Sequence, residues 1–120
     1  MNIQIFGLKK CNDSQKAERF FKERKIQTHF CDLKIKNISK GELNAVTRII
    51  PLEDLIDTKS KQYEKKNLKY IIHDIAEVLL EDSLLLKTPI VRFGTKATVG
   101  YCPDTWTDWI FPKNIKNTED

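Results

Sequence analysis

Apolar and polar residues alternate along residues 2–6, and this period of two predicts a β-strand. Residues 12–25 repeat their apolar positions at helical spacing, which predicts an amphipathic helix capped by Asn12 or Asp13. The apolar stripe of this helix consists of Ala17, Phe20 and Phe21. Residues 27–32 have a strand pattern again and end at a turn-prone aspartate. This order predicts a βαβ unit with two parallel strands and a right-handed crossover.

The middle of the chain has a mainly helical pattern over about residues 39–86. Residues 39–42 read Ser-Lys-Gly-Glu and match a capping box, so a helix is expected to begin there. Pro51 ends this helix and opens a shorter one, residues 59–66 add a helical turn, and residues 74–85 form a further helix. The apolar positions of these helices are Leu43, Val46, Ile49, Ile50, Leu52, Leu55, Ile56, Ile75, Val78, Leu79 and Leu80.

The last third of the chain returns to a strand pattern. Residues 90–93 and 97–100 are strand-like, and a three-residue connection with glycine, residues 94–96, predicts a hairpin between them. Pro103 then begins a helix that Pro112 stops. The large apolar residues of this helix, which we expect to cover the sheet, are Trp106, Trp109 and Ile110.

Length and composition predict one domain. The chain has 120 residues and a mass of 14.0 kDa, which is enough for one hydrophobic core. We expect a single domain over residues 1–112, with an insertion at about 39–86, and a disordered tail over residues 113–120. No apolar stretch approaches the roughly 18 residues that span a bilayer. The first residues lack the pattern of a signal peptide, so we expect a cytoplasmic protein without membrane contact.

The charge pattern argues against a nucleic-acid binder. The formal net charge is +4 and the isoelectric point is near 8.9, which is mildly basic. Basic and acidic residues are interleaved within residues 16–25 instead of gathering one sign on one face. Mixed charges at helical spacing are typical of a solvated helix face. We therefore expect no direct contact with nucleic acid.

The cysteine pattern excludes two common uses of sulfur. The three cysteines, Cys11, Cys31 and Cys102, are odd in number and widely spaced, which is no disulfide framework and suits a reducing compartment. No C-x-x-C motif or cysteine–histidine cluster suggests structural zinc, so no metal is expected. His29 and His73 have no partners at metal-ligand spacing, and we interpret both as structural.

Cys11 is the candidate for sulfur chemistry because it lies between the first strand and the first helix. Backbone N–H groups and the positive end of a helix dipole stabilise a thiolate at such a junction, and Lys9 and Lys10 add positive charge. The alternative is a small buried residue, which free cysteine often is. Ser14 either donates a hydrogen bond to the Cys11 sulfur or serves as a cap or a solvent-facing residue.

The other two cysteines have weaker claims. Cys31 alternates in a strand and is expected to pack. Cys102 follows the fourth strand, and it either resolves a disulfide on Cys11 or is packed or exposed without a role.

Three segments carry a resemblance to a known family: residues 5–14 around Cys11, residues 55–59, and residues 85–91 together with 98–101. Over residues 2–111 the chain resembles the arsenate reductase (ArsC)/Spx family. The resemblance implies an α/β, thioredoxin-like fold, in which a mixed four-stranded sheet is built from βαβ and ββα halves with helices inserted between them.

In that family the cysteine after the first strand is the reactive thiol, so the resemblance implies that Cys11 is catalytic. It also implies that Pro89 is cis and lies beside Cys11, where the Thr88 backbone pairs with an extended thiol partner. The residues expected to bind the thiol or oxyanion are Lys10, Asn12, Ser14, Lys59, Thr88, Pro89, Arg92 and Tyr101.

The chain departs from the family at its oxyanion site. Family arsenate reductases place arginines at three positions that here hold Lys59, Thr88 and Tyr101. An ammonium, a hydroxyl and a phenol do not reproduce the bidentate recognition that guanidinium groups give. Arg92 is close in sequence, and strand alternation leaves its direction open. These replacements weigh against arsenate reduction.

The second departure concerns the Spx-type regulators, which carry C-x-x-C at the first site. Residues 11–14 read Cys-Asn-Asp-Ser, so an intramolecular redox switch of that form is excluded. The hypothesis is therefore a monothiol oxidoreductase that uses Cys11 as nucleophile, with glutathione as co-substrate and no bound cofactor. One alternative is a non-catalytic Spx-like regulator that binds RNA polymerase. Another is an arsenate reductase with an oxyanion site rebuilt from Lys59 and Arg92.

Overall fold

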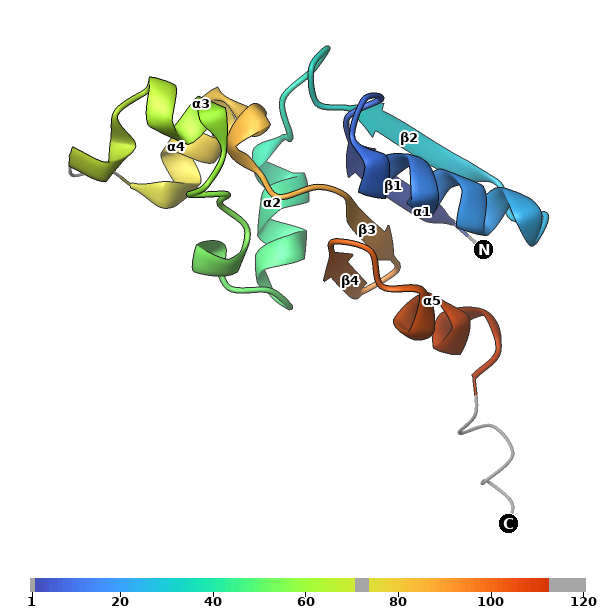
Figure 1. Ribbon diagram of the computed structural model, residues 1–120. Helices are drawn as coiled ribbons and strands as arrows, with labels where there is room; N and C mark the ends of the chain where they lie inside the picture. The colour runs from blue at the N-terminus through green and yellow to red at the C-terminus, as the bar shows by residue number, and fades with distance from the viewer. Residues whose placement is uncertain (1, 71–73, 113–120) are drawn as a thin grey trace.

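The computed structural model describes residues 2–70 and 74–112 (Figure 1). Its strands are β1 (Ile3–Gly7), β2 (Thr28–Asp32), β3 (Ile90–Phe93) and β4 (Lys96–Val99). Its α-helices are α1 (Asn12–Glu23), α2 (Lys40–Thr47), α3 (Lys61–Lys65), α4 (Ile75–Glu81) and α5 (Pro103–Ile110). Three short 3-10 helices complete the middle region: η1 (Leu52–Asp54), η2 (Leu68–Tyr70) and η3 (Ser83–Leu85).

The four strands form one mixed sheet in the order β2-β1-β3-β4. β1 and β2 are parallel, whereas β3 is antiparallel to both β1 and β4. The predicted βαβ unit, ββα unit and mixed four-stranded sheet are therefore confirmed. Because β1 and β3 run in opposite directions, the end of β1 at Gly7 lies next to the start of β3 at Ile90.

Strand alternation divides the core into two layers, one on each face of the sheet. Ile3, Ile5 and Val91 pack with helices α1 and α5, and Trp106 of α5 is fully buried there. Phe6 and Ile90 point to the other face and pack with the helical insertion. Figure 1 shows α1 and α5 close to the sheet. The helices of the insertion, from α2 to α4, form a separate group beside the sheet.

Two backbone hydrogen bonds join residues 55–57 to residues 85–87 and so close the loop of the insertion that lies between these two segments. The Asp57 N–H donates to the Leu85 carbonyl at 2.8 Å, and the Lys87 N–H donates to the Leu55 carbonyl at 2.7 Å. Ile56 and Leu86 form an isolated antiparallel bridge between these bonds. The residue that follows Lys87 is Thr88, so this pairing fixes where the chain leaves the insertion.

Ser83 joins the insertion to the segment that leads into α2. Its side chain is fully buried, its hydroxyl donates to the Leu79 carbonyl at 2.9 Å, and it accepts from the Ile38 N–H at 2.8 Å. Replacing Ser83 with alanine leaves the Ile38 N–H buried without an acceptor. We expect the free energy of unfolding to fall by about 1–3 kcal/mol in urea denaturation. The exposed Thr58→Ala variant is the matched control, and equal effects of both changes would contradict this role for Ser83.

Several sequence-based boundaries need correction. The predicted helix over 74–85 is broken, because Asp82 is extended (φ −147°, ψ 90°) and caps η3 instead of continuing α4. The hairpin loop has two residues, not three: Gly94 has φ 60°, which closes the turn early enough for Lys96 to belong to β4. Ile49 was expected to pack, but it is 51% exposed because α2 ends at Thr47.

The other predicted elements stand as follows. The capping box of α2 is present, with reciprocal hydrogen bonds between Ser39 and Glu42. Pro51 precedes the 3-10 helix η1 instead of directly ending α2. The predicted tail over 113–120 lies outside the described residues. Among the helices that are described, none is both long and apolar enough to cross a membrane.

Candidate thiol site

Cys11 is the N-cap of α1, so it occupies the position where the helix leaves its first N–H groups unpaired. The predicted caps, Asn12 and Asp13, are wrong: both belong to the helix, and no side chain caps it. The Cys11 N–H donates to the Leu8 carbonyl at 3.0 Å, which closes a tight turn after β1. This turn holds the half-buried sulfur at the edge of the sheet where β1 ends and β3 begins.

Ser14 lies beneath the turn and is fully buried. Its hydroxyl accepts from the Leu8 N–H at 3.2 Å and is also hydrogen-bonded to Cys11. Gly7 makes room for it, because a Cβ on Gly7 would lie 2.4 Å from the Ser14 Oγ. The structure therefore decides between the open interpretations of Ser14. This side chain forms hydrogen bonds to Cys11 and to the turn at Leu8, and it does not face solvent.

The second element of the site is the Thr88–Pro89 dipeptide before β3. The peptide bond between the two residues is cis, as the resemblance implied. The Thr88 Oγ1 donates to the Cys11 Sγ at 3.3 Å, and the Cys11 Sγ lies 4.0 Å from the Thr88 carbonyl oxygen. Pro89 is buried, and its carbonyl accepts from the Gly100 N–H at 2.8 Å. The sequence predicted Thr88 at the site but not the contact of its hydroxyl with the sulfur.

These contacts favour the thiolate form of Cys11. Burial raises the pKa of the thiol, but hydrogen bonds from the Ser14 and Thr88 hydroxyls and from the backbone N–H groups of Ser14 and Asp13 outweigh burial. The pKa of Cys11 is therefore lowered from its ordinary value. Because the thiolate is the nucleophile, this shift increases the reactive fraction of the protein at neutral pH.

The predicted contribution of the two lysines needs correction, because neither is among the groups that lower the pKa of Cys11. The Lys9 ammonium lies 5.7 Å from the centre of the Phe30 ring, on β2. Lys10 is exposed in the turn. An exposed ammonium is screened by water, whereas hydrogen bonds act on the sulfur directly.

Replacing Thr88 with valine is expected to raise the pKa of Cys11, because the thiolate loses a hydrogen-bond donor while the side chain keeps its size. Ser14→Ala is expected to act in the same direction. The measurement is the rate of iodoacetamide alkylation against pH, in a protein whose Cys31 and Cys102 are replaced by serine. The rate rises with the thiolate fraction, so both variants should move the curve to higher pH and slow the reaction at pH 7. An unchanged curve for both would contradict the assignment of these donors.

The structure does not bring Arg92 to the thiol, which corrects the predicted site. Arg92 pairs with Gln4 across the sheet and its Nη1 donates to the Gln4 Oε1 at 3.0 Å. The reason is the direction of β3, which starts beside Cys11 at Ile90 and carries Arg92 towards the opposite edge of the sheet.

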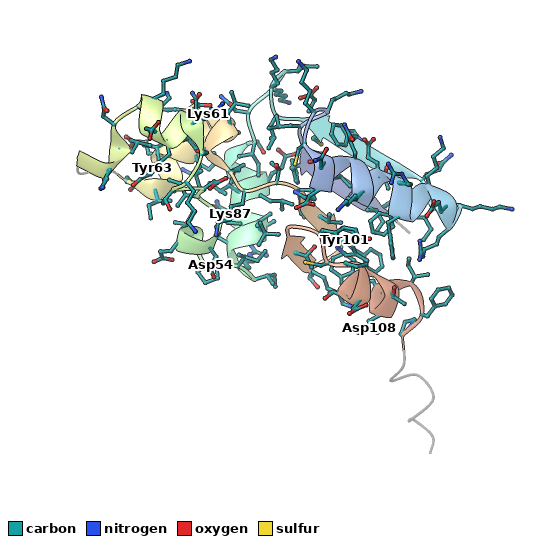
Figure 2. All side chains as sticks on the ribbon, in the orientation of Figure 1. Asp54, Lys61, Tyr63, Lys87, Tyr101 and Asp108 are labelled. Carbon is teal, nitrogen blue, oxygen red and sulfur yellow. The ribbon has the colours of Figure 1, made fainter. Side chains whose placement is uncertain are left out.

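Three further residues that the sequence predicted at the site, Asn12, Lys59 and Tyr101, make other contacts or face solvent. Asn12 and Lys59 are exposed, and the Lys59 N–H donates to the Asp57 carboxylate at 3.1 Å. Tyr101 lies in the segment between β4 and α5 (Figure 2), where its ring packs against Trp106 and lies 5.4 Å from the Lys16 ammonium. The structure gives none of these three side chains a contact with the sulfur among the described residues.

The other two cysteines are free thiols, and their pKa values are raised whereas that of Cys11 is lowered. Burial raises the pKa of Cys31, whose sulfur accepts from the Gln4 amide at 3.5 Å, so the prediction that it packs is confirmed. Burial also raises the pKa of Cys102, which is the N-cap of α5 and donates to the Val99 carbonyl at 3.4 Å. Only Cys11 among the three has a lowered pKa.

Two further expectations concern metals. Among the residues that the structure describes, no group of three or more potential ligands could hold a metal ion. His29, which was interpreted as structural, is exposed on β2 and lines a cavity. His73 lies outside the described residues.

A mixed four-stranded sheet with a cysteine at the N-cap position of a helix and a cis-proline next to it defines a thiol-handling protein of the thioredoxin-like class. Residues 6–109 match the model of the ArsC family. The chain therefore belongs to the ArsC family, a family of thiol-dependent oxidoreductases.

Individual relatives extend this comparison. An uncharacterized protein from Bacillus subtilis, YusI, is 25% identical over 115 residues, covering 90% of this chain and 98% of its own. An arsenate reductase from Haemophilus influenzae is 27% identical over 111 residues, covering 88% and 96%. The solved structure of an arsenate reductase from Vibrio cholerae shares the fold, with a TM-score of 0.77, 18% identity and coverage of 90% and 97%.

Proposed function

We propose that the protein is a monothiol reductase that uses glutathione as its co-substrate. The observation that carries the proposal is the Cys11 sulfur, which is held at the N-cap of α1 and receives a hydrogen bond from Thr88 at 3.3 Å. This arrangement supplies a thiolate without a neighbouring cysteine in the motif, because the fourth residue of the motif is Ser14.

The reaction has two exchange steps. In the first, the Cys11 thiolate attacks the glutathione sulfur of a mixed disulfide R–S–S–G; the S–S bond breaks, R–S⁻ leaves, and Cys11 becomes bonded to glutathione. In the second, the thiolate of another glutathione attacks the same glutathione sulfur, which gives glutathione disulfide and regenerates the Cys11 thiolate. The net reaction reduces R–S–S–G to R–SH and oxidises one glutathione.

The protein offers specific support for each step. The Ser14 and Thr88 hydroxyls stabilise Cys11 both as the attacking thiolate and, in the second step, as the leaving group. The Thr88 carbonyl oxygen lies 4.0 Å from the Cys11 sulfur, so an extended thiol partner is expected to pair with the Thr88 backbone.

The test is the formation of a mixed disulfide on Cys11. We expect incubation with glutathione disulfide to add one glutathionyl group per chain, located on Cys11 by peptide mass spectrometry, and excess glutathione to remove it. If Cys31 or Cys102 is modified instead, or no adduct forms, the proposal is wrong. The hypothesis of a non-catalytic protein that binds RNA polymerase would then become the first to test.

A second candidate function is arsenate reduction, which the Haemophilus influenzae relative favours at 27% identity. Lys59, Thr88 and Tyr101 weigh against it, because they stand where family arsenate reductases are expected to have arginines that bind the oxyanion. Arg92, the remaining candidate, lies away from the thiol. Arsenate-dependent oxidation of glutathione that disappears in Cys11→Ser would support this candidate.

A further inference from the structure

A cavity of about 500 Å³ opens at the edge of the sheet opposite to Cys11. It lies where β1 and β2 begin and β3 ends. The side chains that give it its chemistry are Asn2, Gln4, His29 and Arg92. None of the described residues that line it is acidic.

Three of these residues form a row across the sheet. Gln4 on β1 is the register partner of both His29 on β2 and Arg92 on β3. Directly opposed residues project from the same face, so the amide, the imidazole and the guanidinium stand side by side. Such a row places two nitrogen-rich side chains on either side of a neutral amide.

The hydrogen bonds of Gln4 fix the position of Arg92. The Gln4 Nε2 donates to the Glu42 Oε2 at 3.3 Å and to the Cys31 Sγ at 3.5 Å. Its Oε1 is therefore the group that accepts from the Arg92 Nη1, at 3.0 Å. Because the amide lies between them, Gln4 separates the Glu42 carboxylate from the guanidinium and takes the place of a direct ion pair.

Arg92 consequently keeps binding capacity. A guanidinium has five N–H donors, and the Gln4 amide uses one of them. No carboxylate of the described residues lies within ion-pair distance of Arg92. A guanidinium that is held in place and lacks a counter-ion is suited to a carboxylate or phosphate, which it binds through two parallel hydrogen bonds.

We propose that this cavity binds a small oxyanion, a carboxylate or a phosphate, through Arg92, with His29 and the Asn2 amide as further donors. The cavity volume lies within the range of small-molecule sites. The proposal does not depend on the thiol chemistry of Cys11, since the two sites occupy opposite edges of the sheet.

The test is a titration of the ¹⁵N-labelled protein at pH 7 and constant ionic strength, with inorganic phosphate in one series and succinate in the other. We expect saturable shifts of the Asn2, Gln4 and Gly94 amides in at least one series. The series that saturates first distinguishes a phosphate ligand from a carboxylate ligand. Shifts that stay linear in both series, or that centre on Cys11, would overturn the proposal.

Matched variants locate the ion. Arg92→Gln should weaken binding about tenfold or more, because hydrogen bonds to charged groups are lost. Arg48→Gln makes the same charge change at an exposed arginine on α2's C-cap and should leave the affinity unchanged. Equal effects of the two would mean non-specific attraction and overturn the site.

Two further variants cover a folding failure of Arg92→Gln. Arg92→Lys keeps the charge but loses the planar fork, so it should bind more weakly than the wild type. His29→Gln, at an exposed residue, should also weaken binding. Wild-type affinity in both variants would contradict the proposal.

Discussion

Replacing Cys11 with serine is expected to lower the rate of glutathione-dependent disulfide reduction more than about 100-fold. A serine hydroxyl stays protonated at neutral pH, so the variant keeps the shape of the site but loses the nucleophile. The hydrogen bonds from Ser14 and Thr88 would then have no anion to stabilise. The measurement is the initial rate of glutathione disulfide formation from a mixed disulfide of glutathione and 2-mercaptoethanol, coupled to glutathione reductase.

The other cysteines are the matched controls for this experiment. Cys31→Ser should keep the wild-type rate, since this thiol packs under the sheet and has a raised pKa. Cys102→Ser separates the two interpretations left open by the sequence: a normal rate means that external thiol resolves the intermediate, and a loss of turnover with an intact first step means that Cys102 does. A Cys11→Ser protein with full activity would refute the thiol mechanism.

Replacing Trp106 with alanine is expected to produce the largest loss of stability, about 3–5 kcal/mol. The indole is fully buried between the sheet and α1 and packs against Phe20 and Phe21 at centroid distances of 5.3 and 5.4 Å. Its N–H donates to the Thr98 hydroxyl at 2.8 Å, which ties α5 to β4. Alanine leaves a cavity and removes this hydrogen bond at the same time.

Urea denaturation followed by circular dichroism measures this effect. Trp106→Phe should lose less, because it keeps most of the buried ring and gives up the hydrogen bond. Phe111→Ala is the control, since this aromatic residue is 63% exposed and surface changes of this kind stay within about 0.5 kcal/mol. Similar losses for the Trp106→Ala and Phe111→Ala variants would show that α5 contributes little to the core.

The sequence predicted the strands well because each carries a local pattern. Alternation over residues 2–6 identifies β1, and the consecutive apolar residues directly after Pro89 identify β3. Neither identification requires knowing which strand pairs with which. Boundaries were predicted less well where a single residue's conformation decides them. Asp82 and Gly94 are examples, since an extended aspartate ends α4 and a positive φ shortens the hairpin.

The candidate site was predicted only in part, because a local pattern shows some of its residues and contacts between separate segments decide the others. Cys11 follows from its position between a strand and a helix, and Pro89 was placed beside it by the family resemblance. The roles of Ser14 and Arg92 depend instead on contacts between separate segments of the chain. Ser14 is inward because Gly7 leaves space for it, and no pattern within residues 11–14 encodes that space. Arg92 was misplaced because the register of β3 against β1 decides which edge of the sheet it reaches.

The short path from the insertion to the sulfur has a thermodynamic consequence. The Lys87 amide is anchored on Leu55, and the next residue, Thr88, donates its hydroxyl to Cys11. Ionisation of the thiol strengthens the second contact, and linkage between coupled equilibria is reciprocal. Closure of the loop that Leu55 and Lys87 tie together therefore favours the thiolate, and the thiolate in turn protects that loop from local opening. The ionisation state of Cys11 is thereby readable in the hydrogen-exchange rate of the Lys87 backbone amide, which does not contact the sulfur.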